Sequence, residues 1–228
     1  MRRNNMYDLH IHSIYSDGTS RIDEIAKYAK RKGLKIIAIT DHCSYDSWGN
    51  KLLDLKTVME RRNIIENTRI ADLIILNGLE ADILANGHVV LPKGLGKEFF
   101  DVIIGSFHIL VGVHEWERSL LSVIKSGMVD IIGHPLAYIG KIPWDVAEKI
   151  AIAAADHGVA MELNSHYPFP DIEFLEICRE YGVKFSVGSD AHNLYAVGNV
   201  AECFELAKKL HLKLIDPYHF MKSSDQNI

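Results

Sequence analysis

The chain has 228 residues, 48% of them hydrophobic and 24% charged, which is enough for one globular domain with a sizeable buried core. Its formal net charge of -5 argues against long nucleic acids and anionic membrane surfaces as partners. Three cysteines without a CxxC spacing predict no disulfide framework, and no segment approaches the ~18 consecutive apolar residues of a membrane span. We therefore expect a cytoplasmic protein that forms a single domain over residues 1–228, with a disordered polar tail from about residue 222.

Short apolar runs with the length of β-strands recur along the chain and alternate with amphipathic helical stretches. The apolar runs cover residues 7–12, 35–42, 73–81, 102–108, 129–135, 159–164 and 184–192. Most are apolar at consecutive positions, as in strands that are covered on both faces. Helical spacing is found in residues 22–33, 55–70, 120–127, 143–158, 174–182 and 200–210. The glycines and proline of residues 86–97 predict a loop or hairpin in place of a helix after the third strand.

This alternation of strand and helix predicts parallel βαβ units with right-handed crossovers. Seven such strands can close into a distorted (β/α)7 barrel, similar to the eight-stranded TIM barrel but smaller, and this is the fold we expect. A doubly wound open sheet is the alternative. In parallel α/β folds of both kinds, sites are built where the C-terminal ends of the strands come together.

Most of the expected strands end in histidine, aspartate or glutamate. These side chains are His10, His12, His42, Glu80, His108, His134, Asp190 and His192. His10 and His12 are two residues apart in a strand, so both face the same side and can bind one ion. A single histidine at a strand end is more often a hydrogen-bonded structural residue, but six histidines at the ends of five strands favour a metal centre. Imidazole and carboxylate together suit Zn, Mn or Fe better than Ca or Mg.

The same residues resemble the motifs of the PHP (polymerase and histidinol phosphatase) superfamily. In chain order the motifs read Asp8-Leu9-His10-Ile11-His12-Ser13 with Ser16-Asp17-Gly18, Ile39-Thr40-Asp41-His42, Ile132-Gly133-His134-Pro135 and Gly188-Ser189-Asp190-Ala191-His192, and Glu80 and His108 complete the set. The resemblance runs from Tyr7 to about Val200. It is strongest to stand-alone phosphoesterases and to the PHP domain attached to family X DNA polymerases, and it implies a single metal-dependent phosphoesterase domain.

The resemblance also implies two or three divalent ions. The expected ligands are His10, His12, Glu80 and Asp190 for the first ion, a bridging Glu80 with His108 and His134 for the second, and Asp17, His42 and His192 for the third. Two close ions can activate a shared water for attack on phosphorus. Asp17 would orient that water or accept a proton. If the third site were empty, His42 or His192 would protonate the leaving group.

The function we expect is hydrolysis of a phosphate monoester, either a small phosphorylated metabolite or a nucleotide. The alternatives are a phosphodiesterase or 3'-5' exonuclease that acts on nucleotide ends, and a non-catalytic metal-bound module. TatD-type barrel nucleases share an HxH first motif but do not account for the third ligand set. Asn164 and His166, at the end of the sixth strand, are expected to contact the substrate. The sequence leaves open the substrate, the native metal, the general acid and the oligomeric state.

Overall fold

Parallel strands form one continuous sheet in the computed structural model, which describes residues 6–139, 141–168 and 171–221. In chain order the strands are β1 (Tyr7–Ile11), β2 (Ile36–Ile39), β3 (His42–Cys43), β4 (Ile74–Asp82), β5 (Val102–Ser106), β6 (Ile131–Ile132), β7 (Ala160–Asn164) and β8 (Phe185–Gly188). The predicted disordered tail from about residue 222 lies outside the described residues.

The first and last strands meet, so the sheet curls into a nearly closed barrel. The strand order is β1-β2-β4-β5-β6-β7-β8, and the short β3 pairs with β4 beside this path. At the seam, Ile11 and Ala191 form a parallel bridge, and the His12 backbone N–H donates to the Ala191 carbonyl at 2.9 Å. The predicted seven-stranded barrel is therefore confirmed, and the open doubly wound sheet is excluded.

Three predicted strands are clearly shorter in the structure than the sequence suggested. The run 184–192 contributes only the four residues of β8. The run 35–42 is divided into β2, which pairs with β1 and β4, and β3, which pairs only with β4. Thr40, between them, donates its backbone N–H to the Ile11 carbonyl at 2.8 Å. The run 129–135 contributes only two residues to β6, and two positions beyond its end His134 adopts a φ of 27°, outside the extended conformation.

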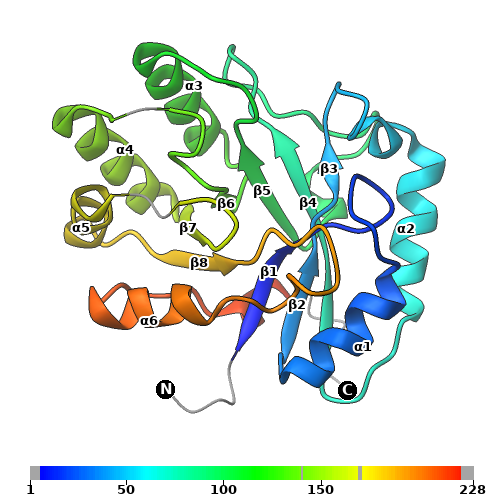
Figure 1. Cartoon of the computed structure of the whole chain (residues 1–228). Coiled ribbons are helices and arrows are strands. Elements are labelled where there is room, and N and C mark those ends of the chain that lie inside the picture. The colour runs from blue at the N-terminus through cyan, green and yellow to red at the C-terminus, as the bar shows by residue number, and fades with distance from the viewer. Residues whose placement is uncertain (1–5, 140, 169–170, 222–228) are drawn as a thin grey trace.

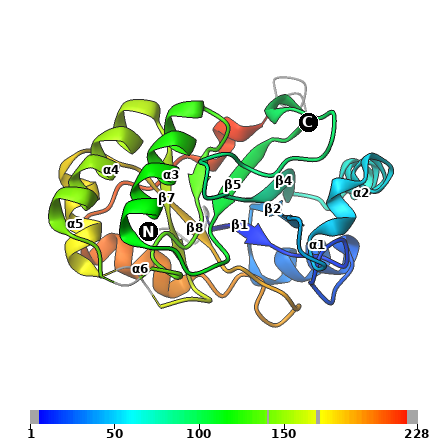
Figure 2. The same cartoon turned by 90° about the horizontal axis from the view of Figure 1, so that it is seen from above.

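Six α-helices of the described chain cover the outside of the barrel (Figure 1). They are α1 (Ile22–Lys32), α2 (Leu55–Asn67), α3 (Val113–Ser126), α4 (Trp144–His157), α5 (Ile172–Glu180) and α6 (Ala201–Lys209). Figure 2 shows α3 to α6 grouped on one side of the barrel and α1 and α2 on the other. Helix α1 ends where predicted, at Gly33, whose φ of 83° closes the last turn.

No α-helix connects β4 to β5 in the structure, as the glycines and proline of residues 86–97 predicted. The connection is a loop that ends in the short 3-10 helix Lys97–Phe99. Among the described residues, none of the helices has both the length and the apolar character that a membrane crossing requires. Buried apolar side chains fill the space between the strands and helices, as Leu120 of α3 and Ile150 of α4 do at 0% exposure. The strands are therefore held rigidly, with their C-terminal ends at one mouth.

Candidate metal centre

All nine residues that were predicted as metal ligands lie together at this mouth. They are His10, His12, Asp17, His42, Glu80, His108, His134, Asp190 and His192, and each places a nitrogen or a carboxylate oxygen within 4.0 Å of another member. Within the described part of the chain, three groups have ligand atoms close enough to share an ion. Histidines and carboxylates that are far apart in the sequence therefore form one continuous cluster.

Glu80, at 0% exposure, is the centre of this cluster. Its Oε1 atom lies 3.1 Å from Nε2 of His134 and 3.3 Å from Nε2 of His108. Its Oε2 atom faces the other way, 3.2 Å from Nε2 of His10 and 3.4 Å from Nε2 of His12. Nδ1 of His42 is closer still to Oε2, at 2.8 Å. The two oxygens of one carboxylate thus address separate groups of two and three histidines, which is the geometry of a bridging ligand.

Asp190 completes the group around His10 and His12. Its Oδ1 atom lies 3.0 Å from Nε2 of His12 and 3.8 Å from Nε2 of His10. Asp190 has a backbone φ of 51° and His134 a φ of 27°. Both values lie in the left-handed region, which residues other than glycine rarely adopt. Such conformations cost about 1–3 kcal/mol each and concentrate at functional sites. The fold therefore tolerates backbone strain at two of the nine clustered residues.

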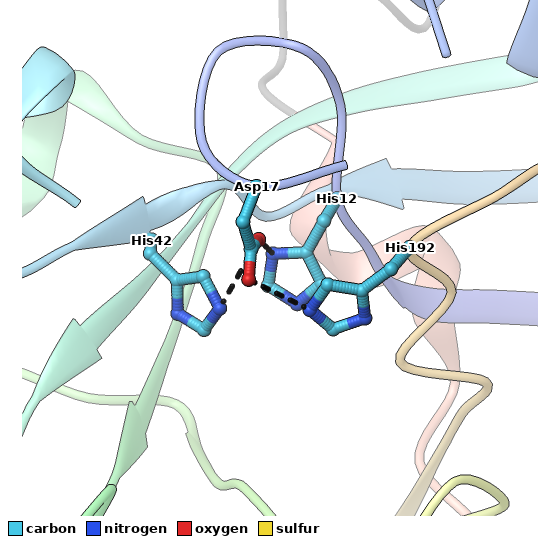
Figure 3. Close-up of side chains that lie close together, drawn as sticks. All are labelled: His12, Asp17, His42 and His192. Atoms are coloured by element: carbon cyan, nitrogen blue, oxygen red, sulfur yellow. Dashed lines mark ion pairs between the residues drawn. The ribbon is translucent and has the colours of Figure 1, made fainter. Parts of the chain in front are cut away.

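Asp17 forms a second focus, on the loop that follows β1 (Figure 3). Its Oδ2 atom lies 3.2 Å from Nε2 of His192, and its Oδ1 atom lies 3.5 Å from Nε2 of His42 and 4.0 Å from Nδ1 of His12. The rings of His42 and His192 stack on that of His12, with centroids 4.2 and 4.3 Å away. Figure 3 shows the three imidazoles grouped around the Asp17 carboxylate.

Three histidines face more than one group, although the sequence analysis assigned each of them to one ion. His192 turns Nε2 toward Asp17 and Nδ1 toward Asp190. His12 turns Nε2 toward Asp190 and Nδ1 toward Asp17. His42 turns Nε2 toward Asp17 and Nδ1 toward Glu80, at 2.8 Å. The imidazoles of His12 and His42 connect the Asp17 group to the Glu80 group, so the whole cluster is electrostatically coupled.

Several buried atoms of the cluster make no contact with hydrogen-bond geometry among the described residues, although ion pairs join some of them to one another. They are His10 Nε2, His12 Nδ1, His42 Nδ1, His134 Nδ1 and Glu80 Oε2. A buried polar group without a partner costs about 1–3 kcal/mol. Imidazole nitrogens and carboxylate oxygens gathered in this way fit divalent transition-metal ions, which would satisfy the unpaired atoms facing the cluster.

The charges in the cluster shift the pKa values of its histidines in opposite directions. Burial lowers the pKa of His10, but the carboxylates of Glu162, Glu80 and Asp190 outweigh burial and raise that pKa well above its ordinary value. The pKa of His108 rises to about 10, because Glu80 and Asp82 outweigh the effect of burial. Burial, reinforced by His42, lowers the pKa of His12 to about 4. Without metal, therefore, some of these nitrogens hold protons that a metal ion must displace.

Glu162, on β7, supports the cluster and was missed by the sequence analysis. Its Oε1 atom lies 2.8 Å from Nδ1 of His10, and its Oε2 atom accepts the His134 backbone N–H at 2.8 Å. Gly188 makes room for it, since a Cβ there would lie 2.2 Å from Oε1. The sequence did contain a signal for Glu162: it is a glutamate in a mostly apolar, buried strand. A carboxylate in such a strand needs charged or hydrogen-bonding partners, so its presence points to a polar cluster nearby.

Asp82 supports His108 in the same way. Its Oδ1 atom lies 2.8 Å from Nδ1 of His108, and its Oδ2 atom accepts a hydrogen bond from Ser44 Oγ at 2.5 Å. Glu80 and Asp82 are two residues apart on β4, so their side chains share one face of the strand. A carboxylate behind a metal-binding histidine fixes the ring orientation and raises the basicity of the free nitrogen.

The chain matches the model of the PHP domain over residues 8–166 and that of the PHP-associated region over residues 174–212. It belongs to the PHP family. A protein from Thermoanaerobacter sp. (strain X514), named as a probable phosphatase, is 33% identical over 217 residues, covering 88% of this chain and 84% of that protein. The DNA polymerase/3'-5' exonuclease PolX of Bacillus subtilis (strain 168) is 31% identical over 211 residues, covering 89% of this chain and 37% of the polymerase.

Among solved structures, the PHP chain resembles a histidinol phosphate phosphatase from Lactococcus lactis in complex with zinc, L-histidinol and phosphate. The TM-score is 0.67 at 19% identity, and the match covers 92% of this chain and 95% of that one. It also resembles metal-dependent tyrosine phosphatases, YwqE from Bacillus subtilis and CpsB from Streptococcus pneumoniae, with a TM-score of 0.54 at 19% identity. These similarities show that the barrel is the PHP fold.

The two residues predicted to contact substrate have different surroundings in this PHP site. Asn164 is 2% exposed, and its amide group is engaged by Glu162, Asp190 and the backbone N–H groups of His166 and Tyr167. The exposed His166 lies beside His192, with ring centroids 5.8 Å apart. Asn164 therefore links Glu162 and Asp190 to the backbone after β7. Contact of either Asn164 or His166 with substrate stays a prediction.

A tyrosine pair at the mouth was also missed by the sequence analysis. The hydroxyls of Tyr138 and Tyr167 lie 2.8 Å apart, and the Tyr167 ring centroid lies 4.7 Å from that of His134. Both tyrosines come from loops rather than from strand ends, and no residue spacing marks such a pair in the sequence.

We predict that the metal-free protein loses stability as the pH rises from 7 to 9. The folded pKa of His108 is about 10, above the ordinary 6.5, so its stabilising contribution is complete below pH 6.5 and declines toward pH 10. The raised pKa values of His10 and His42 act in the same direction. Urea unfolding in chelator should show a smaller free energy of unfolding at pH 9 than at pH 7. With Mn²⁺ present the decline should shrink or reverse, because metal binding favours deprotonated nitrogens. A rise in chelator would contradict the assignment.

Replacing Glu162 by glutamine should weaken metal binding, because the amide removes the charge that orients His10. We expect metal affinity to fall about 10- to 100-fold, measured by competition with a chromophoric chelator. Glu180→Gln, on the exposed end of α5, is the matched control and should bind like the wild type. Equal affinity in both variants would show that His10 does not depend on Glu162.

Proposed function

We propose that this PHP chain is a metal-dependent phosphatase that hydrolyses a monoester of a small phosphorylated metabolite or nucleotide. The observation that carries the proposal is the fully buried Glu80 carboxylate, whose Oε1 faces two histidines and whose Oε2 faces three others. This arrangement supports two close divalent ions with a shared ligand. Relatives that cover most of the chain at 31–33% identity are named as phosphatases, which supports the same class.

We propose the following division of ligands, with Zn, Mn or Fe as the metal. The closest ligand atoms form overlapping groups, in which His12 also joins Asp17, His42 and His192, and His42 also joins Glu80 and His108. His10, His12, Glu80 and Asp190 would hold the first ion, Glu80, His108 and His134 the second, and Asp17, His42 and His192 the third. Bound ions of this kind lower the pKa of a water nucleophile and neutralise charge on the phosphate oxygens. His12 and His42, each facing two groups, would couple the third site to the first two.

Asp17 and His192 are the candidates for proton movement. Asp17 is 34% exposed. Burial raises its pKa, but hydrogen bonds with His192 and His42 outweigh burial and hold the pKa below its ordinary value. The carboxylate therefore stays charged and can orient a water, whereas its lowered pKa weakens it as a proton acceptor. His192 is 30% exposed, and Asp17 and Asp190 raise its pKa against the effect of burial. With the third site empty, protonated His192, or His42 behind it, would donate a proton to the leaving alkoxide.

The second candidate is a phosphodiesterase or 3'-5' exonuclease with the same ligands. The similarity to PolX, whose name includes a 3'-5' exonuclease, favours it. This chain spans 37% of PolX, and its net charge of -5 gives no general attraction to long nucleic acid. We therefore propose that the partner is a small phosphorylated substrate.

The deciding experiment is metal analysis of protein purified without chelator, combined with assays on p-nitrophenyl phosphate and bis-p-nitrophenyl phosphate. Two or three ions per chain with chelator-sensitive monoester hydrolysis would support the phosphatase. Preference for the diester would favour the phosphodiesterase. Bound metal without turnover of either compound would contradict a general phosphatase and favour a non-catalytic module or a narrow specificity.

Glu80→Gln should abolish monoester hydrolysis and release much of the metal, because one neutral amide cannot bridge two cations. Activity and metal content are measured on the same sample. Glu98→Gln, in the loop before β5, is a control outside the cluster and should retain both. Full turnover by Glu80→Gln would refute a two-metal mechanism.

Asp17→Ala should remove the third ion and leave the first two, because Asp17 lies 3.2 Å from His192 and 3.5 Å from His42, closer than the 4.0 Å that separates it from His12 of the first site. We expect metal content to fall by one ion per chain, and hydrolysis to decrease by at least tenfold. Three ions in this variant would show that Asp17 is not a ligand of the third site.

A further inference from the structure

Arg61 of α2 is a cation without solvent contact. Its side chain is 0% exposed, and no other lysine or arginine of the described residues is buried. A buried guanidinium is stable only when its charge and its N–H groups are matched by partners. The partners of Arg61 therefore indicate what this cation does in the fold.

The guanidinium of Arg61 joins β4 to the segment that links β2 and β3. Its Nε atom donates to Asp41 Oδ2 at 2.6 Å, and Nη1 donates to Asn77 Oδ1 at 2.8 Å. Its Nη2 atom donates to the Gly78 carbonyl at 3.0 Å and also to the Ile39 carbonyl. Four acceptors thus fix the guanidinium plane, and one of them is a carboxylate.

The Asp41 carboxylate passes this constraint to the loop that follows β1. Asp41 Oδ1 accepts the Ser13 backbone N–H at 2.6 Å and the Ser16 hydroxyl at 3.0 Å, and Oδ2 accepts the Ser13 hydroxyl at 2.8 Å. Both serines are buried, at 0% and 7% exposure. Asp17 directly follows Ser16, so the bonds to Asp41 fix the backbone from which the Asp17 carboxylate projects.

Further contacts hold this loop on the same side of the barrel. The Tyr15 hydroxyl donates to Glu60 Oε1 on α2 at 3.0 Å, and Lys51 Nζ donates to the Ile14 carbonyl at 2.7 Å. The turn is also tight at its end, because a Cβ on Gly18 would lie 2.5 Å from the His12 carbonyl oxygen. The loop therefore has little freedom to move Asp17 once Asp41 is fixed.

We propose that Arg61 is a positioning residue for the third ion: through Asp41 it holds the loop 13–17 so that Asp17 faces His42 and His192. The proposal rests on the proposed function, because it takes those three side chains as ligands. Arg61 touches neither the ions nor the substrate. It acts through Asp41, which binds the loop that carries Asp17, and so determines the affinity for the third ion.

Arg61→Lys tests this role while keeping the positive charge. A lysine ammonium cannot reproduce the planar fork that reaches Asp41, Asn77 and the backbone carbonyls. Arg62→Lys, the neighbouring position on α2, is the matched control, since Arg62 pairs with the exposed Glu66 and not with Asp41. Ser16→Ala is a milder second variant, because it removes only one hydrogen bond to Asp41. Mn²⁺ binding is measured by calorimetry and by metal analysis, with circular dichroism as a check on folding.

We expect Arg61→Lys and Ser16→Ala to bind two ions with unchanged affinity and the third about 10- to 100-fold more weakly, while Arg62→Lys matches the wild type. Unchanged affinity for the third ion in both test variants would overturn the proposal. An equal loss at all three sites would also overturn it, since that is the result of a purely structural role. If the wild type binds only two ions, the positioning role fails, although monoester hydrolysis would still support the phosphatase. Selective loss of the third ion in a protein without phosphatase activity would support the positioning role and refute the proposed function.

Discussion

A fully buried carboxylate surrounded by five imidazoles is the interaction on which this structure depends. The two oxygens of Glu80 lie within 3.4 Å of His10, His12, His42, His108 and His134. The negative charge keeps the pKa of several of these histidines high, and they in turn keep the pKa of Glu80 far below its usual value despite its burial. Protons or metal ions are the two means of balancing this group of charges, and the unpaired buried atoms favour metal ions.

The surrounding structure provides what such a cluster needs. Glu162 and Asp82 each stand behind a histidine, and Asp8 accepts the Ser189 backbone N–H at 2.9 Å and the Gly198 backbone N–H at 2.9 Å. The loop that carries Asp190 and His192 is thereby attached to the first strand. Around the nine clustered residues there is thus a layer of carboxylates and serines that fixes their orientation, and a layer of apolar side chains that keeps it rigid.

Much of the barrel and of the cluster could be predicted from the sequence, for a physical reason. Parallel strands place their C-terminal ends at one mouth, so His10, His42, His134 and Asp190 had to converge once the strands were recognised. The limits of the prediction also have physical causes. No residue pattern reveals the unusual φ of His134, two positions beyond the short β6. Arg61 acts from the middle of a helix, where an arginine ordinarily faces solvent, and its burial depends on Asp41 and Asn77 together. The double orientation of His12 and His42 depends on side-chain packing at the mouth.

The seam of the barrel has a consequence for how the protein unfolds. At the seam, Ile11 of β1 forms a backbone bridge with Ala191, just after β8, and the Asp8 side chain accepts hydrogen bonds from Ser189 and Gly198. The ligand candidates His12 and Asp190, on either side of this seam, are 178 positions apart in the chain. An ion held by both would act as a reversible cross-link that closes a loop of most of the polypeptide. The entropy that such a cross-link removes from the unfolded chain grows with the length of the loop it closes, although only slowly. A metal ion at this seam would therefore stabilise the folded barrel partly by restricting the unfolded chain.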